Sequence, residues 1–220
     1  MPREREEFFR KSNTTEREKI FVLAFEGNVT EEQYFSEFKN SNKFNDELIY
    51  LHLLKRPTTD TNSVPIHVFT RLKKEVKDEF NFNEGDELWM IIDRDRWHNI
   101  PEIIEACKAV DNMFIAVSNP CFEFWLLLHI KDIKEYEPCE LDMILKNGKV
   151  GNRNYVETKI VEVIGSYNKK KLKTEEFIPC VDTAVLRAKT LDVNKEEYPT
   201  NLGSHIYKLI EKIRRVEIYN

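Results

Sequence analysis

Residues 87–96 read Glu-Leu-Trp-Met-Ile-Ile-Asp-Arg-Asp-Arg, an apolar segment that ends in two acids, Asp93 and Asp95. An apolar run of this length predicts a short buried strand. Residues two apart on a strand point to the same side, so the two carboxylates should share one space. At about 4 Å and an effective dielectric near 20, two such charges repel by roughly 4 kcal/mol. Mg²⁺ would relieve this repulsion; alternatively, Asp93 caps a turn or helix and Asp95 is solvated.

The segments around this strand alternate between apolar runs and helical patterns. We predict further strands at residues 20–25, 48–54 and 113–117, with helices between them. This alternation is typical of an α/β fold, with a mainly parallel sheet flanked by helices. Right-handed crossovers bring the C-terminal ends of parallel strands to one edge, where ligands of open α/β sheets bind.

A third acid, Glu26, follows the first predicted strand, where the chain turns into a helix. Thr30 should cap that helix, and Gln33 should complete a capping box. If the first strand and the central strand are neighbours in the sheet, Glu26 converges with Asp93 and Asp95. The spacing of these residues along the chain does not prove that adjacency.

A fourth acid, Glu123, lies in the segment Ser-Asn-Pro-Cys-Phe-Glu-Phe-Trp-Leu-Leu-Leu-His at residues 118–129. Ser118 or Asn119 should cap a helix whose other residues are almost wholly apolar, and a helix that is apolar all round is buried. Glu123 in its first turn is favoured by the helix dipole. It is either a further acid of the same cleft or an acid with a purely structural role.

The overall composition narrows the class of protein. The 220 residues are 41% hydrophobic and 33% charged, as in soluble globular proteins. No apolar run approaches the roughly 20 residues of a membrane span, and residues 1–11 lack an apolar signal core, so we expect a cytoplasmic protein without membrane contact. A net charge of −5 argues against a uniformly basic nucleic-acid surface, although residues 169–173 form a local basic patch.

Two further classes are not expected. The four cysteines form no Cys-x-x-Cys pair and have no histidine at zinc-finger spacing, which indicates reduced thiols rather than structural zinc. The chain also lacks a Walker motif, so we do not expect it to hydrolyse ATP itself.

We divide the chain into a flexible charged arm at residues 1–18, an α/β domain at 19–130, and a mostly helical C-terminal region at 131–220 packed on the same domain.

Several motifs resemble those of RloB/AbiLii-like proteins: Glu-Gly followed by Thr-Glu-x-x-Tyr-Phe at residues 26–35, Ile-Ile-Asp-Arg-Asp at 91–95, and the block at 118–129. The resemblance covers nearly the whole chain from Ile20 onward. It implies a TOPRIM-type domain, a small Rossmann-like unit shared with topoisomerases, primases and OLD-type nucleases. The hallmarks of that domain are a glutamate after the first strand and Asp-x-Asp after a later one.

The resemblance also implies a function. RloB-like proteins are typically encoded beside an ABC/AAA-type ATPase and are associated with anti-phage defence or restriction loci. In related two-part defence systems, the TOPRIM partner is an effector nuclease held in check by the ATPase. We therefore expect an endonuclease dependent on Mg²⁺ or Mn²⁺ that cleaves RNA or DNA, with tRNA as one candidate substrate and a homodimer as one candidate assembly. The expected metal-binding and catalytic residues are Glu26, Asp93, Asp95 and Glu123, and the expected substrate-binding residues are Lys169, Lys170 and Arg94.

Two other readings stay open. The chain could be a non-catalytic regulatory partner of the ATPase, with a degenerate metal site. It could also use the same cleft in the manner of a nucleotidyl transferase or primase. Metal binding distinguishes the first of these from the nuclease.

Overall fold

The computed structural model describes residues 19–27, 29–55, 64–79, 83, 85–94, 97 and 99–215, with the side chains of residues 75–79 left out. The predicted arm at residues 1–18 and the predicted site residue Asp95 lie outside the described residues. The main sheet has five strands in the order β2-β1-β3-β4-β7. Four of them run parallel, and β7 pairs antiparallel with β4, which confirms the predicted mainly parallel α/β fold. The strands are β1 (Lys19–Phe25), β2 (Ile49–Leu54), β3 (Glu87–Asp93), β4 (Met113–Asn119) and β7 (Gly203–Ser204).

The central strands are buried on both faces, as their continuous apolar sequences require. On β1, Phe21, Leu23 and Phe25 belong to one core cluster, whereas Val22 and Ala24 belong to a second cluster on the opposite face. This alternation follows from the two-residue period of a strand. Each face of the sheet therefore needs its own layer of helices.

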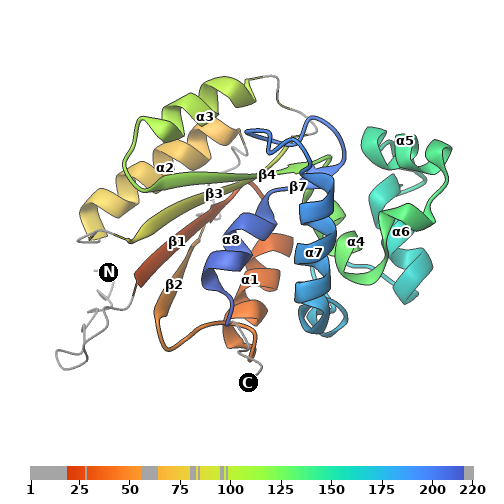
Figure 1. Ribbon diagram of the computed structural model, residues 1–220, viewed down its shortest axis with the longest axis horizontal. Coiled ribbons are helices and arrows are strands. Elements are labelled where there is room, and N and C mark those ends of the chain that lie inside the picture. Colours follow the sequence, from red (N-terminus) through yellow and green to blue (C-terminus); the bar gives the residue numbers. More distant parts are fainter. Residues whose placement is uncertain are drawn as a thin grey trace.

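Figure 1 shows those two layers. Helices α2 and α3 cover one face, while α1, α4 and α8 pack on the other, with α7 against α4. The first core cluster joins α4 to β1 and β3, so α4 is buried all round, as its sequence predicts. The helices are α1 (Thr30–Asn40), α2 (Pro65–Glu79), α3 (Ile100–Lys108), α4 (Phe122–Ile130), α7 (Val181–Leu191) and α8 (Ile206–Ile213).

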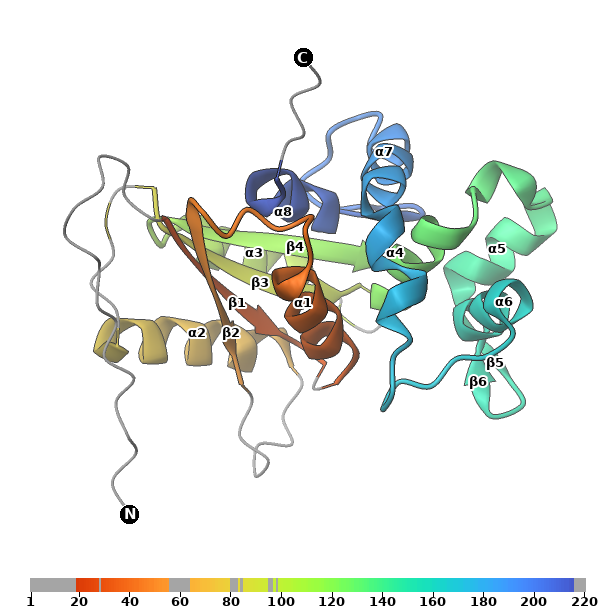
Figure 2. The same ribbon diagram turned by 90° about the horizontal axis from the view of Figure 1, so that it is seen from below.

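A smaller group of elements lies beside α4, away from the sheet (Figures 1 and 2). It consists of α5 (Pro138–Lys146), the hairpin β5 (Lys149–Val150) and β6 (Arg153–Asn154), and α6 (Tyr155–Ile164). Helix α6 packs directly on α4. Three short 3₁₀ helices complete the described elements: Ile133–Glu135, Thr174–Glu176 and Ile178–Cys180. Within the described segments, no helix has the length and apolar character needed to cross a bilayer.

Candidate functional site

Glu26 and Asp93 meet at the C-terminal edge of the sheet. Because β1 and β3 are paired neighbours, with Phe25 opposite Ile91, the chain after β1 lies against the end of β3. The Asp93 amide donates to Glu26 Oε2 at 3.1 Å, and the Trp97 indole Nε1 donates to Glu26 Oε1 at 2.9 Å. The first strand and the central strand are therefore neighbours in the sheet, as the predicted convergence of Glu26 and Asp93 requires.

Asp93 also connects the sheet to α4. Its Oδ1 accepts a hydrogen bond from the Phe122 amide at 2.8 Å, at the first turn of the helix. Helix N-termini have unpaired N–H groups and a partial positive charge, so this contact favours the ionised carboxylate. Asp93 at the end of β3 thus caps helix α4. A helix cap was one of the two roles predicted for this residue.

The predicted caps of α4 are wrong. The N-cap position is Cys121, without a side-chain hydrogen bond, because Ser118 and Asn119 are the last two residues of β4. The Ser118 hydroxyl pairs with the Ser204 hydroxyl at 2.8 Å, and the Asn119 amide donates to the Asn201 carbonyl at 2.8 Å. These two side chains hold the β7 segment on the sheet instead.

Glu31 is a buried acid beside this edge that the sequence prediction missed. Glu31 is 6% exposed and forms no ion pair with a described residue. The Glu31 carboxylate lies directly over Gly27, so that a Cβ atom at Gly27 would collide with it. Burial, followed by the negative charge of Glu123, raises the pKa of Glu31 from 4.5 to about 7, and the charge of Glu26 adds to this effect.

The sequence does contain a signal for Glu31. Tyr34, Phe35 and Phe38 are aromatic residues at helical spacing, and Glu31 lies three and four residues before the first two. Positions spaced by three and four residues share one face of a helix, so Glu31 had to point inward with the aromatic residues.

Glu123 occupies the predicted position in the first turn of α4, and a lysine neutralises it. The Lys169 ammonium lies 2.8 Å from Glu123 Oε1 and 2.9 Å from Glu157 Oε1, and the Tyr167 hydroxyl donates to Glu123 Oε1 at 3.1 Å. Burial lowers the pKa of Lys169, but the charge of Glu123 and the hydrogen bonds to both acids outweigh it, and the pKa lies above its ordinary value. Lys169 therefore remains a cation shared by two buried carboxylates.

Replacing Lys169 with methionine should destabilise the fold by about 1–2 kcal/mol. Removing one partner of a buried ion pair typically costs 3–5 kcal/mol, and we expect less here because the Lys169 side chain is 47% exposed. Urea unfolding at neutral pH measures the change, with Lys171→Met as the control, since Lys171 is an exposed lysine of the same loop. Adding Glu123→Gln should restore part of the loss; equal effects of Lys169→Met and Lys171→Met would contradict the shared role of Lys169.

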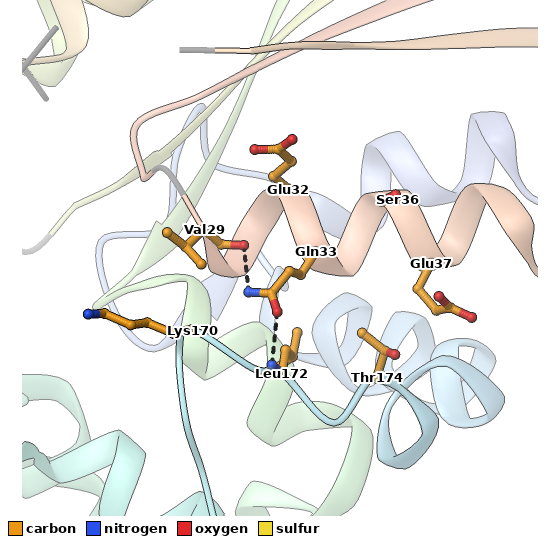
Figure 3. A pocket seen from close by; sticks show the side chains of 8 residues that line it. All are labelled: Val29, Glu32, Gln33, Ser36, Glu37, Lys170, Leu172 and Thr174. Carbon is orange, nitrogen blue, oxygen red and sulfur yellow. Dashed lines mark hydrogen bonds between the residues drawn. The ribbon is translucent and has the colours of Figure 1, made fainter. Parts of the chain in front are cut away.

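Gln33 fixes the loop that carries Lys169 to the start of α1 (Figure 3). Its Nε2 donates to the Val29 carbonyl at 2.9 Å and to the Lys169 carbonyl at 2.8 Å, and its Oε1 accepts from the Leu172 amide at 3.0 Å. The predicted capping box is wrong: the N-cap is Val29, and Thr30 is already helical and buried. The Gln33 amide therefore joins the first residues of its own helix to the backbone of residues 169–172.

We expect Gln33→Leu to lower the free energy of unfolding by about 1 kcal/mol, because partly exposed hydrogen bonds contribute roughly 0.5–1.5 kcal/mol each and leucine retains some packing. The more specific readout is hydrogen exchange at the Leu172 amide, which should become faster. Glu37→Leu introduces the same side chain on the same helix at a position with no hydrogen-bond partner among the described residues. Unchanged exchange at Leu172 in the Gln33 variant would refute the proposed tether.

Arg94 and Lys170, two predicted substrate-binding residues, lie at different places. The Arg94 guanidinium donates to the Thr200 carbonyl at 2.9 Å and lies over the Tyr198 ring. Lys170 borders a groove next to α1, with its side chain extending away from Gln33 (Figure 3). Of the predicted cations, the structure brings Lys169 alone into ionic contact with a predicted acid, as far as the described residues extend.

The donor chemistry of this edge suits a hard divalent cation, but the described residues do not complete a ligand set. Carboxylate oxygens are the protein ligands that Mg²⁺ prefers, and Glu26, Glu31 and Asp93 supply them. Among the residues the structure describes, no group of three or more His, Cys, Asp or Glu side chains is arranged to hold an ion. Asp95, two residues beyond Asp93, lies outside those residues.

Comparison with known families gives one match. The family of RloB-like proteins matches residues 21–213, a span that contains Glu26, Glu31, Asp93, Glu123 and Lys169. Comparisons with curated proteins and with solved structures give no match. The matched span covers most of the chain, in agreement with the motifs at residues 26–35, 91–95 and 118–129. This chain belongs to the RloB-like protein family.

Proposed function

We propose that the protein is a metal-dependent nuclease that cleaves phosphodiester bonds at the Glu26–Asp93 edge. The observation that carries the proposal is the meeting of acids at this edge. Glu26 accepts a hydrogen bond from the Asp93 amide at the C-terminal ends of two parallel strands. The buried Glu31 lies close enough to Glu26 for their charges to interact, and it forms no ion pair with a described residue. Neighbouring acids at such an edge raise the proton affinity of Glu31, and a bound cation would offset their mutual repulsion.

Glu26, Asp93 and Asp95 are the residues that would hold Mg²⁺ or Mn²⁺. The bound cation would polarise a phosphoryl oxygen and stabilise charge on the leaving oxygen. Two N–H donors, the Asp93 amide and the Trp97 indole, orient the Glu26 carboxylate. The Asp93 carboxylate is fixed in the same way by the Phe122 amide.

Glu31 is our candidate for the general base. A base works best when its pKa lies near the working pH, and the pKa of Glu31 is about 7. Its ionised carboxylate would accept the proton of the attacking water. Lys169 lies close enough to lower the pKa of Glu31, and its half-exposed side chain would let it contact a phosphate as well.

The resemblance of the motifs extends the proposal to the biological setting. We propose that the protein acts as the effector subunit of an anti-phage or abortive-infection system, controlled by an ABC/AAA-type ATPase encoded alongside. RNA and DNA are both candidate substrates, including tRNA. A homodimer is one candidate assembly, and it would contain two Glu26–Asp93 edges.

A second candidate is a non-catalytic partner of the ATPase, and specific contacts favour it. Asp93 has a structural task as a helix cap, and Glu123 is already neutralised by Lys169. A site in which each acid had only such a task would not need a metal ion. Calorimetric titration with Mg²⁺ and with Mn²⁺ separates the two candidates.

For a nuclease, the titration should show binding at micromolar to low millimolar metal, and the same preparation should cleave RNA or DNA only when metal is present. Both measurements use the full chain, alone and with its ATPase. Absence of metal binding up to several millimolar, together with absence of cleavage in either preparation, would favour the regulatory role.

A further inference from the structure

A short hairpin projects from the group of elements beside α4. Its strands β5 and β6 pair with Val150 opposite Arg153, so the connecting loop consists of Gly151 and Asn152. Gly151 has a φ of +61°, in agreement with the glycine that one class of two-residue hairpin loops has at its first position. Every residue from 148 to 153 is exposed, and none belongs to either core cluster. The hairpin is therefore a protrusion rather than a part of the core.

The base of the hairpin is fixed at the start of α4. The buried Asn147 side chain donates from Nδ2 to Cys121 Sγ at 3.3 Å, and its Oδ1 accepts from the Val156 amide at 3.1 Å. Cys121 is the N-cap of α4, and the next residue, Phe122, donates its amide to Asp93. The hairpin thus begins beside the helix end that Asp93 caps, next to the acidic edge of the sheet.

A second segment lies near the base of the hairpin. Lys169 binds Glu157 in the first turn of α6, which directly follows β6, and so places residues 167–173 there. Figure 2 shows this segment and the hairpin projecting on the same side of the molecule. Lys170 extends past Val29 at the start of α1 (Figure 3). One segment thus borders the start of α1 and the other the start of α4, the two helices that begin near the acidic edge.

This region of the chain has an excess of positive charge. Residues 138–173 contain eight basic and four acidic side chains, a net charge of +4, although the whole chain has a net charge of −5. Lys159 and Lys169 neutralise three of the four acids, and the fourth is Asp142 on α5. The other basic side chains, here called the basic surface, are exposed and form no ion pair with a residue that the structure describes: Lys146, Lys149, Arg153, Lys170, Lys171 and Lys173.

The charge and position of the basic surface favour a nucleic-acid backbone as its ligand. Lysine and arginine pair with phosphates, and the release of condensed counterions supplies the affinity. A lipid surface is less suitable, because proteins that lie on a bilayer bury apolar side chains in it. Within residues 147–154, all of which the structure describes, Val150 is the one exposed large apolar residue.

The register of the hairpin favours a duplex over a single strand. Residues paired across two strands share a face, and Arg153 is opposite Val150, the neighbour of Lys149. Lys149 and Arg153 therefore lie on opposite faces of the hairpin. A ribbon with a cation on each face suits a groove that has a phosphate backbone on each side. The major groove of B-DNA admits a two-stranded ribbon, and an RNA duplex has a wide minor groove.

We propose that the β5–β6 hairpin enters a groove of a nucleic-acid duplex and that the basic surface binds the two phosphate backbones. The inference rests on the proposed function, because it treats the duplex as the substrate that is cleaved at the Glu26–Asp93 edge. Binding to the hairpin itself requires neither a metal ion nor cleavage. The two proposals can therefore be tested separately.

The test titrates the full chain, in the presence of a chelator, into short fluorescently labelled DNA duplexes, RNA duplexes and single strands. We expect saturable binding that is tighter for at least one duplex than for single strands. The hairpin variant combines Lys146→Gln, Lys149→Gln and Arg153→Gln, and it should bind that duplex at least 10-fold more weakly. Each phosphate contact contributes about 0.9 to the slope of log affinity against log salt, so this slope should decrease by about 2–3 in the variant.

The matched control removes three exposed lysines from other elements and changes the net charge equally: Lys19→Gln, Lys74→Gln and Lys134→Gln. The control should change the affinity by less than about twofold, and thermal unfolding verifies that both triple variants are folded. Three results would overturn the proposal: no saturable binding of a duplex, equal weakening by the two triple variants, or single strands bound as tightly as duplexes. Competition by poly-glutamate as effective as that of the duplex would also overturn it and indicate an acidic protein partner.

A cleavage assay distinguishes failure of this inference from failure of the proposed function. If both are right, the hairpin variant should raise KM for the duplex at least 10-fold and leave kcat nearly unchanged. Cleavage with an unchanged KM in the hairpin variant would leave the nuclease in place and contradict the role of the hairpin. Duplex binding that the hairpin variant weakens, without cleavage at any metal concentration, would contradict the nuclease and support the binding surface.

Discussion

The Asp93→Asn variant should lose metal-dependent cleavage by about 10²–10³-fold and still fold normally. Removing one group that stabilises transition-state charge typically costs this factor. The asparagine side-chain oxygen can still accept the hydrogen bond from the Phe122 amide, so the connection between β3 and α4 is retained. Initial rates with Mg²⁺ and with Mn²⁺ measure the loss, and thermal unfolding measures the fold.

Two further variants sharpen the test of Asp93. Asp93→Ala also removes the helix cap and should destabilise the protein by about 1–2 kcal/mol in addition to losing activity. Asp111→Asn changes the same charge at an exposed loop position and should alter neither property. Cleavage by Asp93→Asn at close to the unmodified rate would show that this carboxylate is a helix cap without a catalytic task.

Glu31→Gln should make the protein more stable and less active. The pKa of Glu31 is 4.5 in an exposed chain and about 7 in the folded protein, so at intermediate pH the folded form binds more protons than the unfolded form. The contribution of Glu31 to stability is therefore complete below pH 4.5 and is lost as the pH rises to 7. Glutamine does not titrate and avoids this loss.

The gain from Glu31→Gln should accordingly be near zero below pH 4.5 and reach about 1–3 kcal/mol above pH 7, since one pKa unit corresponds to about 1.4 kcal/mol. Urea unfolding in the presence of a chelator, at several pH values, measures it. Cleavage should fall in the same variant if Glu31 is the base. A variant that is destabilised at pH 8 would show that Glu31 has a favourable partner as an ionised group.

Much of the fold could be predicted because its signals are local. The burial of β1, β3, β4 and α4 can be predicted from the apolar residues of each segment alone. The predicted helical C-terminal region also contains a strand, because Gly203 and Ser204 pair with β4 directly before α8. A two-residue strand has no periodicity to detect.

The site depends more on contacts between distant residues. The acids Glu26 and Asp93 could be proposed from their places after strands, but their meeting required β1 and β3 to be neighbours. The pairing of Glu123 with Lys169 joins residues on α4 and on a loop far along the chain, and no local pattern predicts it. The role of Gln33 was missed because its spacing from Thr30 also fits a capping box.

A crystal of the full chain soaked in Mn²⁺ tests the central claim most directly, through the anomalous signal of the metal. We predict an ion bound by carboxylate oxygens of Glu26, Asp93 and Asp95 at about 2.1–2.2 Å, with Glu31 facing the same space. A saturating soak in which no ion lies at this edge, with the Asp93 carboxylate still on the Phe122 amide, would contradict the account.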